Sequence, residues 1–322
     1  MATRIGTDIN EAARLLRAGH VVAMPTETVY GLAANAFDEA AVLEVFQVKQ
    51  RPSFDPLIVH IARRADLDRL AAALPPGAEA LMGAFWPGPL TLVLPKRSVV
   101  PDLVTSGLDT VGVRMPAHPM AQALLRELDF PLAAPSANPF GYVSPTTAQH
   151  VADQLGGKVP YILDGGACTV GVESTIIGWE NDANGAGQWM LYRVGGIPVE
   201  AIEMVIGRVD ERAGHLQTVA PGMLASHYAP RKQVFIGDIA TLLREHGPER
   251  CGVIALRTDH GAAINEVLSP KGDLNEAARH LFAALRRLDA SACAVILAEV
   301  FPEEGLGRAI NDRLRRAAAK RG

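Results

Sequence analysis

The 322-residue sequence contains no apolar run long enough to cross a bilayer, because its longest apolar stretches have strand length and are broken by proline, glycine or charge. Cysteine is scarce as well. Cys168, Cys251 and Cys293 are scattered and odd in number, which argues against a disulfide framework and matches no metal-site spacing. Residues 1–19 carry two acidic side chains within an amphipathic pattern, unlike a signal peptide. We therefore expect a cytoplasmic protein without a membrane segment.

Common nucleotide and catalytic signatures are also missing. The sequence has no Gly-x-x-x-x-Gly-Lys-Ser/Thr loop, and Gly305-x-Gly307 lacks the third glycine of a dinucleotide-binding loop. There is no His-Glu-x-x-His zinc helix and no Gly-x-Ser-x-Gly nucleophile elbow. A nucleotide would therefore have to be bound in another way.

An overall basic character is absent too. The net charge is −4, with −6 in residues 1–208 and +2 in the remainder. A dedicated nucleic-acid-binding protein usually presents a basic face, so the composition disfavours that class and leaves only a local basic groove open.

The length and the patterns predict an α/β protein of two domains. Residues 1–208 mix helices and strands with hairpin-like connections, which favours a twisted mixed sheet in a catalytic domain. Periodicity is lost over 209–232, an expected interdomain linker. Residues 233–322 alternate strands and helices, which indicates a small Rossmann-like domain with a parallel sheet.

The stretch from Pro25 to His60 is the most informative one. An apolar strand ends at Pro25, threonine hydroxyls follow at a turn, and a helix from about Glu39 to Gln47 leads to Lys49 and Arg51. Hydroxyls, two cations and a histidine at the ends of elements suggest an anion-binding pocket. The alternative is an ordinary strand–turn–helix whose cations only complement the helix dipole. From these residues alone the two interpretations weigh equally.

Later polar residues stand at strand ends in the same way. Arg114 ends a strand before a proline, Arg193 ends another, and Ser174 begins one. Each could instead be an ordinary surface or structural residue. The polar residues after a short strand near position 135, Ser136, Asn138 and Ser144, could simply form a turn. Asp164-Gly165-Gly166 reads more readily as a turn than as a metal site.

Several ordered motifs closely resemble the L-threonylcarbamoyladenylate synthases, a family of YrdC-type domains. The motifs are Pro25-Thr26-Glu27-Thr28-Val29-Tyr30-Gly31-Leu32, Lys49-Gln50-Arg51-Pro52, Pro56-Leu57-Ile58-Val59-His60, Thr110 to Pro116, Pro135-Ser136-Ala137-Asn138, Ser144-Pro145-Thr146, Asp164-Gly165-Gly166, Glu173-Ser174-Thr175 and Arg193. The likeness covers residues 5 to 208. It extends to Pro221-Gly222-Met223, His227-Tyr228-Ala229-Pro230 and Gly305-Leu306-Gly307-Arg308-Ala309-Ile310, which is typical of the longer, two-domain form.

The resemblance implies an ATP-dependent nucleotidyltransferase that makes threonylcarbamoyl-AMP from L-threonine, bicarbonate and ATP, with Mg²⁺ accompanying ATP and pyrophosphate released. The product would pass to the machinery that transfers the threonylcarbamoyl group to tRNA, with weak RNA contact possible. Carbamate oxygen would attack the α-phosphorus of ATP, so positioning and positive charge matter more than a covalent nucleophile.

The resemblance also implies roles for individual residues. Threonine would be held by Thr28, His60, Arg114, Ala134 and Ser174, with Arg114 as the carboxylate partner. The ATP site would contain Lys49, Arg51, Asp55, Thr110, Ser136, Ser144, Arg193 and Tyr228, and Lys49 and Arg51 would be the catalytic pair. Asp55 stands where the family carries Asn, and Leu224-Ala225-Ser226 replaces a more basic run. We expect Tyr228 to make the linker a lid, so that deleting residues 209–322 raises the KM for ATP or abolishes turnover.

Two rival functions remain open at this stage. One is a non-catalytic RNA-binding relative, which the −6 charge of residues 1–208 disfavours and a steep salt dependence of RNA binding would support. The other is a carbamoyltransferase that handles carbamoyl-adenylate. The zinc-finger and acylphosphatase-like segments expected of that class are missing from the sequence, and threonine-independent pyrophosphate release would support it.

Overall fold

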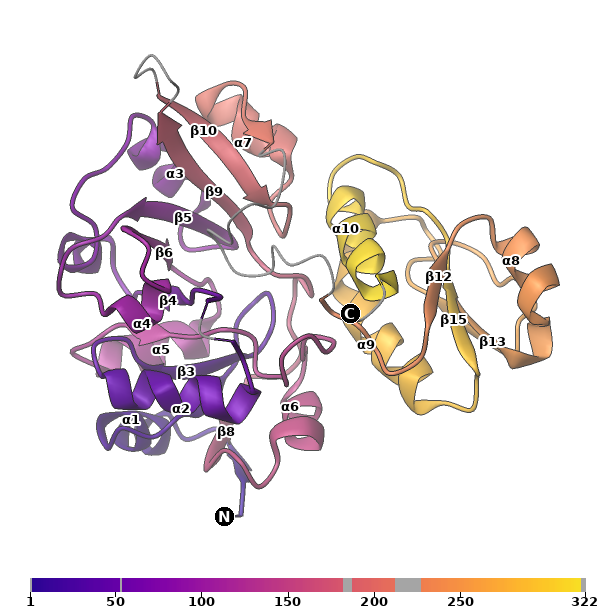
Figure 1. Cartoon of the computed structure of the whole chain (residues 1–322), viewed down its shortest axis with the longest axis horizontal. Coiled ribbons are helices and arrows are strands. Elements are labelled where there is room, and N and C mark those ends of the chain that lie inside the picture. Colours follow the sequence, from indigo (N-terminus) through magenta and orange to yellow (C-terminus); the bar gives the residue numbers. More distant parts are fainter. Residues whose placement is uncertain (1, 53, 182–186, 212–226, 320–322) are drawn as a thin grey trace.

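A computed structural model describes residues 2–52, 54–181, 187–211 and 227–319 (Figure 1). Within these ranges the first sheet has eleven strands in the order β1-β8-β2-β3-β7-β4-β6-β5-β9-β10-β11. Its strands are β1 (Arg4–Gly6), β2 (Val22–Met24), β3 (Gly31–Asn35), β4 (Ile58–His60), β5 (Leu90–Pro95), β6 (Thr110–Arg114), β7 (Leu132–Ala133), β8 (Tyr161–Leu163), β9 (Thr175–Asn181), β10 (Gly187–Arg193) and β11 (Asp210–Glu211). Parallel and antiparallel pairs alternate irregularly across it, which confirms the predicted mixed sheet.

Helices cover this sheet on both faces. They are α1 (Ile9–Arg17), α2 (Glu39–Lys49), the 3₁₀ helix η1 (Arg64–Arg69), α3 (Ala78–Phe85), α4 (Asp102–Thr105), α5 (Pro119–Glu127), α6 (Ala148–Leu155) and α7 (Val199–Ile206). The short η1 precedes α3, and the strands β1 and β3 were not anticipated from the sequence. Asp210–Glu211 pair with β10, so the first sheet runs past residue 208.

The second sheet has the order β12-β15-β13-β14, and its described pairs are all parallel, as predicted. Its elements are β12 (Val234–Ile236), α8 (Ile239–His246), η2 (Pro248–Arg250), β13 (Cys251–Ala255), β14 (Ile264–Val267), α9 (Leu274–Ala290), β15 (Val295–Ala298) and α10 (Gly307–Ala318). The strand β14 was not anticipated. Most of the predicted linker, residues 212–226, lies outside the described residues.

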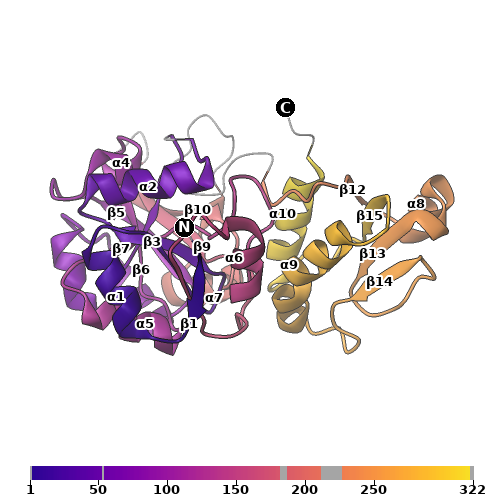
Figure 2. The same cartoon turned by 90° about the horizontal axis from the view of Figure 1, so that it is seen from below.

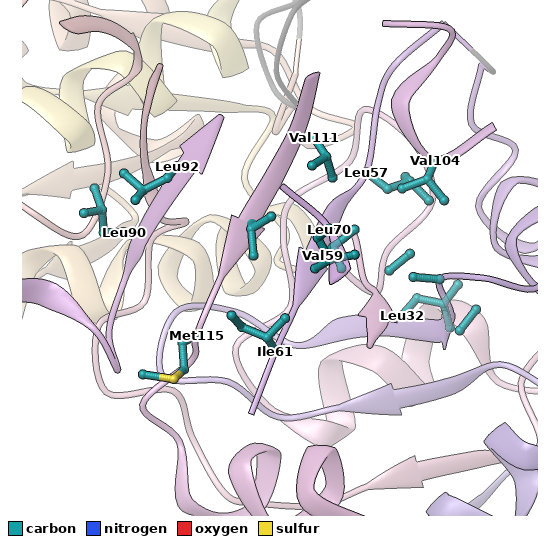
Figure 3. Packing of buried hydrophobic residues seen from close by; sticks show 14 of the residues in the cluster. Leu32, Leu57, Val59, Ile61, Leu70, Leu90, Leu92, Val104, Val111 and Met115 are labelled. Atoms are coloured by element: carbon teal, nitrogen blue, oxygen red, sulfur yellow. The ribbon is translucent and has the colours of Figure 1, made fainter. Parts of the chain in front are cut away.

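Side chains along β4 and β6 point alternately to the two faces of the sheet, so core residues lie on one face and site residues on the other. Val59 and Val111 point into the apolar core beneath the sheet, together with Leu92 of β5 (Figure 3). Because successive side chains of a strand point to opposite faces, Ile58 and His60 must point to the other face. On that face α1 and α5 pack over β2, β3, β7 and β8, whereas Ile58 joins a separate small cluster with Val93 and Ile176.

The ends of α2 explain the place of the two predicted catalytic cations. Asp38 caps the helix by accepting hydrogen bonds from the backbone N–H groups of Ala40 (3.0 Å) and Ala41 (3.3 Å). Gln50 adopts a left-handed conformation (φ 53°) and ends the helix. Lys49 is consequently the last helical residue, two positions later than predicted, and Arg51 follows the cap.

The two domains meet along α9 and α10, which face the first domain in both views (Figures 1 and 2). Arg286 of α9 donates to the carbonyl of Ser144 (3.2 Å), and Tyr142 donates to the carboxylate of Asp289 (2.5 Å). Gly171 lies so close to α9 that a Cβ there would be 2.4 Å from the Cα of Arg279, and its φ of +81° favours glycine. No helix within the described ranges is long and apolar enough to span a membrane.

Candidate active site

Strand register brings three predicted site residues into one row across the first sheet. His60 of β4 pairs with Arg114 of β6, and Arg114 pairs with Thr91 of β5. Thr91 pairs with Ile176 of β9, which pairs in turn with Arg193 of β10. Ser174, just before β9, shares a 2.8 Å hydrogen bond between its hydroxyl and that of Thr91. Four of the residues expected to contact ligands, His60, Arg114, Ser174 and Arg193, therefore lie together at adjacent ends of neighbouring strands.

Arg114 is held in place by partners on two segments, the turn after Pro25 and the turn before β5. Its Nη1 donates to the hydroxyl of Thr28 (2.8 Å), and its Nε donates to the carbonyl of Gly88 (3.2 Å). Its Nη2 lies 2.5 Å from a carboxylate oxygen of Glu27, an ion-pair contact without hydrogen-bond geometry. Both charged side chains are buried, so this guanidinium keeps a fixed direction and strong local charge.

The predicted threonine-binding residues converge on a single cavity. It is lined by all five of them, namely Thr28, His60, Arg114, Ala134 and Ser174, and also by the predicted ATP residues Arg51, Ser136, Arg193 and Tyr228. Residues of the Pro25–His60 stretch therefore line a cavity that also contains the cations Arg114 and Arg193, and its role as an anion pocket stays a prediction. That stretch supplies only one side of the cavity.

Arg51 and Lys49 have different positions. Arg51 lines the cavity and is paired with the buried carboxylate of Asp55 at 2.8 Å. Lys49 lies behind the wall, where its ammonium donates to the backbone carbonyls of Ser136 and of Asn138 (2.6 Å). Burial and the neighbouring Arg51 hold the pKa of Lys49 well below its usual value. Burial also raises the pKa of Asp55 despite the opposing charge of Arg51.

The remaining predicted ATP residues differ in their distance from the cavity. Ser144 is fully buried and donates its hydroxyl to Glu173 (2.6 Å), so it reaches the cavity only through that carboxylate. Thr110 begins β6, four residues and about 13 Å of strand before Arg114. Arg193 donates to the carbonyl (3.1 Å) and the hydroxyl (3.2 Å) of Ser174. Asp55, Lys49, Ser144 and Thr110 thus do not line the cavity itself.

Several buried polar atoms around the cavity have no hydrogen-bond partner among the described residues. They are Nδ1 of His60, Nδ1 of His227 and the hydroxyl of Tyr228. Buried polar groups in native proteins are nearly always paired, so unpaired ones at a cavity point to a ligand. Burial, reinforced by Arg114, lowers the pKa of His60 to about 3, and this imidazole is neutral near pH 7. Burial lowers the pKa of His227 as well.

Sequence reasoning missed three residues that either line the cavity or hold one of its lining residues in place. Glu27 and Glu173 sit inside quoted motifs, next to Thr28 and Ser174, and could have been considered for that reason alone. His227 precedes the predicted Tyr228 and also lines the cavity. Among the described residues, no group of three or more His, Cys, Asp or Glu side chains could hold a metal ion.

Comparison with known proteins shows the family of this chain. Residues 14–195 match the family described as "Telomere recombination", and residues 197–319 match "Threonylcarbamoyl-AMP synthase, C-terminal domain". The chain is 45% identical to the threonylcarbamoyl-AMP synthase of Pyrococcus abyssi, over 97% of this chain and 94% of that protein. It is 43% identical to the Bacillus subtilis protein of the same name, over 97% and 93%.

A solved structure extends the likeness to the whole fold. The crystal structure of P. abyssi Sua5 complexed with L-threonine matches with a TM-score of 0.90 and 42% identity, covering 99% of this chain and 98% of that one. Both sheets and both domains are therefore shared. The chain belongs to the threonylcarbamoyl-AMP synthase family, in its two-domain form.

Proposed function

We propose that the chain makes L-threonylcarbamoyl-AMP from L-threonine, bicarbonate and ATP in the cytoplasm, and that the product supplies the machinery that modifies tRNA. One observation carries the proposal: His60, Arg114 and Arg193 stand in one row above a cavity whose walls carry unpartnered polar atoms. The row provides a neutral imidazole for a small polar group and two cations for anions.

Threonine would occupy the side of the cavity formed by Thr28, His60 and Arg114. The fixed guanidinium of Arg114 suits a carboxylate, and the similar P. abyssi structure is a complex with L-threonine. Neutral His60 can hydrogen-bond the hydroxyl of threonine through its unpartnered Nδ1. The methyl of Ala134 adds an apolar contact beside Gly31, whose absent side chain leaves room there.

ATP would occupy the side formed by Arg51, Ser136, Arg193 and Tyr228. The guanidiniums of Arg51 and Arg193 can face the triphosphate, while Lys49 holds the turn at Ser136 in place by donating hydrogen bonds to its backbone carbonyls. Asp55, which stands where the family carries Asn, is the counter-ion of Arg51 and holds that guanidinium in one orientation. The unpartnered hydroxyl of Tyr228 supports the proposal that the linker reaches the nucleotide.

The chemistry follows from bringing three anionic groups together: the carboxylate of threonine, the carbamate and the triphosphate of ATP. Threonine's amine and bicarbonate condense to a carbamate with loss of water, and a carbamate oxygen then attacks the α-phosphorus of ATP and displaces pyrophosphate. Arg51 and Arg193 would offset the charge that develops on the phosphates. Arg114 would hold the threonine carboxylate so that the carbamate oxygen is aligned with the α-phosphorus. We propose that Mg²⁺ arrives as part of the MgATP substrate, with phosphate and water oxygens as its ligands.

The deciding experiment measures pyrophosphate release from MgATP and bicarbonate, with and without L-threonine. We expect release to require threonine and the nucleotide product to contain threonine by mass spectrometry. L-serine and L-valine serve as matched controls, since one lacks the methyl and the other replaces the hydroxyl. Release without threonine would redirect the assignment to a carbamoyl-adenylate enzyme. Absence of any release, with salt-sensitive RNA binding instead, would support an RNA-binding protein.

A further inference from the structure

The C-terminal domain reaches the active-site wall through one buried arginine of α10. The side chain of Arg313 is fully buried and uses all three nitrogens. Its Nε donates to Glu173 (2.7 Å), its Nη2 to the carbonyl of Val194 (3.0 Å) and its Nη1 to Asp312 (2.5 Å). Such a forked arrangement suits arginine, because a lysine ammonium is a single point of charge.

The partners of Arg313 in the first domain are chain neighbours of cavity residues. Glu173 precedes Ser174 at the start of β9, and Val194 follows Arg193 at the end of β10. The guanidinium also lies 5.0 Å from the ring centre of Tyr228, a cation–π contact with the linker residue that lines the cavity. One side chain therefore touches two walls and the linker at once.

The charge of Glu173 gives this contact a chemical consequence. Glu173 lines the same cavity as Arg51 and Arg193, the cations proposed to face the triphosphate. An unpaired carboxylate there would repel phosphate in a low-dielectric environment. Instead, one carboxylate oxygen accepts from Ser144 (2.6 Å) and the other from Arg313 (2.7 Å). Both oxygens therefore have partners, and Arg313 offsets the charge of Glu173 while Arg316 also pairs with Asp312, the other carboxylate on Arg313.

We propose that Arg313 is a positioning residue for the nucleotide: it neutralises Glu173 and fixes the end of β10 beside Arg193 and the Tyr228 ring on the ATP side. The C-terminal domain thereby completes the ATP site while leaving the threonine side, built on Thr28, His60 and Arg114, to the first domain. This inference rests on the proposed function, because it presumes that phosphates lie beside Glu173.

The test compares R313Q, the double variant E173Q/R313Q and the matched control R279Q by titration calorimetry with MgATP and with L-threonine. Arg279 is an exposed arginine of the same domain that also donates across the interface, to the carbonyl of Thr169 (2.9 Å). We expect R313Q to weaken ATP binding at least about tenfold, because it leaves a buried carboxylate unpaired. Threonine binding should change less than about twofold, and the R279Q variant should bind both ligands normally.

The double variant separates charge neutralisation from simple loss of structure. Because E173Q removes the repelling carboxylate, E173Q/R313Q should recover most of the lost ATP affinity, and R313K should lie between the unchanged chain and R313Q. Equal weakening of both ligands without recovery in the double variant would reduce Arg313 to a structural residue and overturn the inference. ATP affinity unchanged in R313Q and R313K would overturn it too. An unchanged chain that binds no ATP would instead refute the proposed function, and the inference with it.

Discussion

Replacing Arg114 with glutamine tests the assignment of the threonine side most directly. In the structure the guanidinium contacts Thr28, Gly88 and the buried carboxylate of Glu27. A hydrogen bond to a charged group contributes about 1.5–3 kcal/mol, so losing the proposed contact with threonine's carboxylate should weaken binding about tenfold to hundredfold. Titration calorimetry with L-threonine measures this change.

The same substitution should also destabilise the fold, and the two effects must be separated. R114Q leaves Glu27 buried without its cation, which costs about 3–5 kcal/mol and lowers the melting temperature by roughly 10 °C. The double variant E27Q/R114Q removes the unpaired charge, so its melting temperature should recover while threonine binding stays weak. R97Q, at an exposed arginine that donates to Ala71 (3.0 Å), is the control. Threonine affinity in folded R114Q within twofold of the unchanged chain would refute the reasoning.

Three further predictions concern the linker, pH and the core. In Y228F the lost hydroxyl has no partner among the described residues, so the KM for ATP should rise about fivefold with no loss of thermal stability; an unaltered KM would contradict contact with the nucleotide. The pKa of His60 is about 3 in the fold, below its ordinary 6.5, so its contribution to stability is complete above pH 6.5 and falls as the pH drops toward 3. Urea unfolding should therefore show a stability loss on the order of 3 kcal/mol at pH 4.5 that is smaller in H60Q; equal losses in the two proteins would exclude His60 as the source. Leu92→Ala, at a fully buried position, should cost about 2–5 kcal/mol in the same assay, and a cost under about 1 kcal/mol would mean that this site collapses around the missing atoms.

Local rules determined much of this protein in advance. The apolar run before Pro25, the capped helix ending near Lys49 and the alternation in β6 were all predictable, since each depends on residues close together in the chain. The mixed first sheet and the parallel second one followed from the same patterns. Short strands such as β3, made of Gly31–Asn35, escaped notice because small residues carry little periodicity. The motifs also named His60, Arg114, Ser174 and Arg193, although they could not say how these residues meet.

Only the tertiary structure decided which residues face one another. The order β4-β6-β5-β9-β10 places His60, Arg114 and Arg193 in one row, whereas another strand order would have scattered them. Likewise, the pairs Glu27–Arg114 and Glu173–Arg313 join distant parts of the chain, and the second joins two domains. Register and domain docking are set by the burial of whole faces, so no local pattern records these contacts. The sequence by itself determined the elements and the chemical groups at their ends. Packing decided that those groups form one cavity and that Glu173 in its wall pairs with an arginine from the other domain.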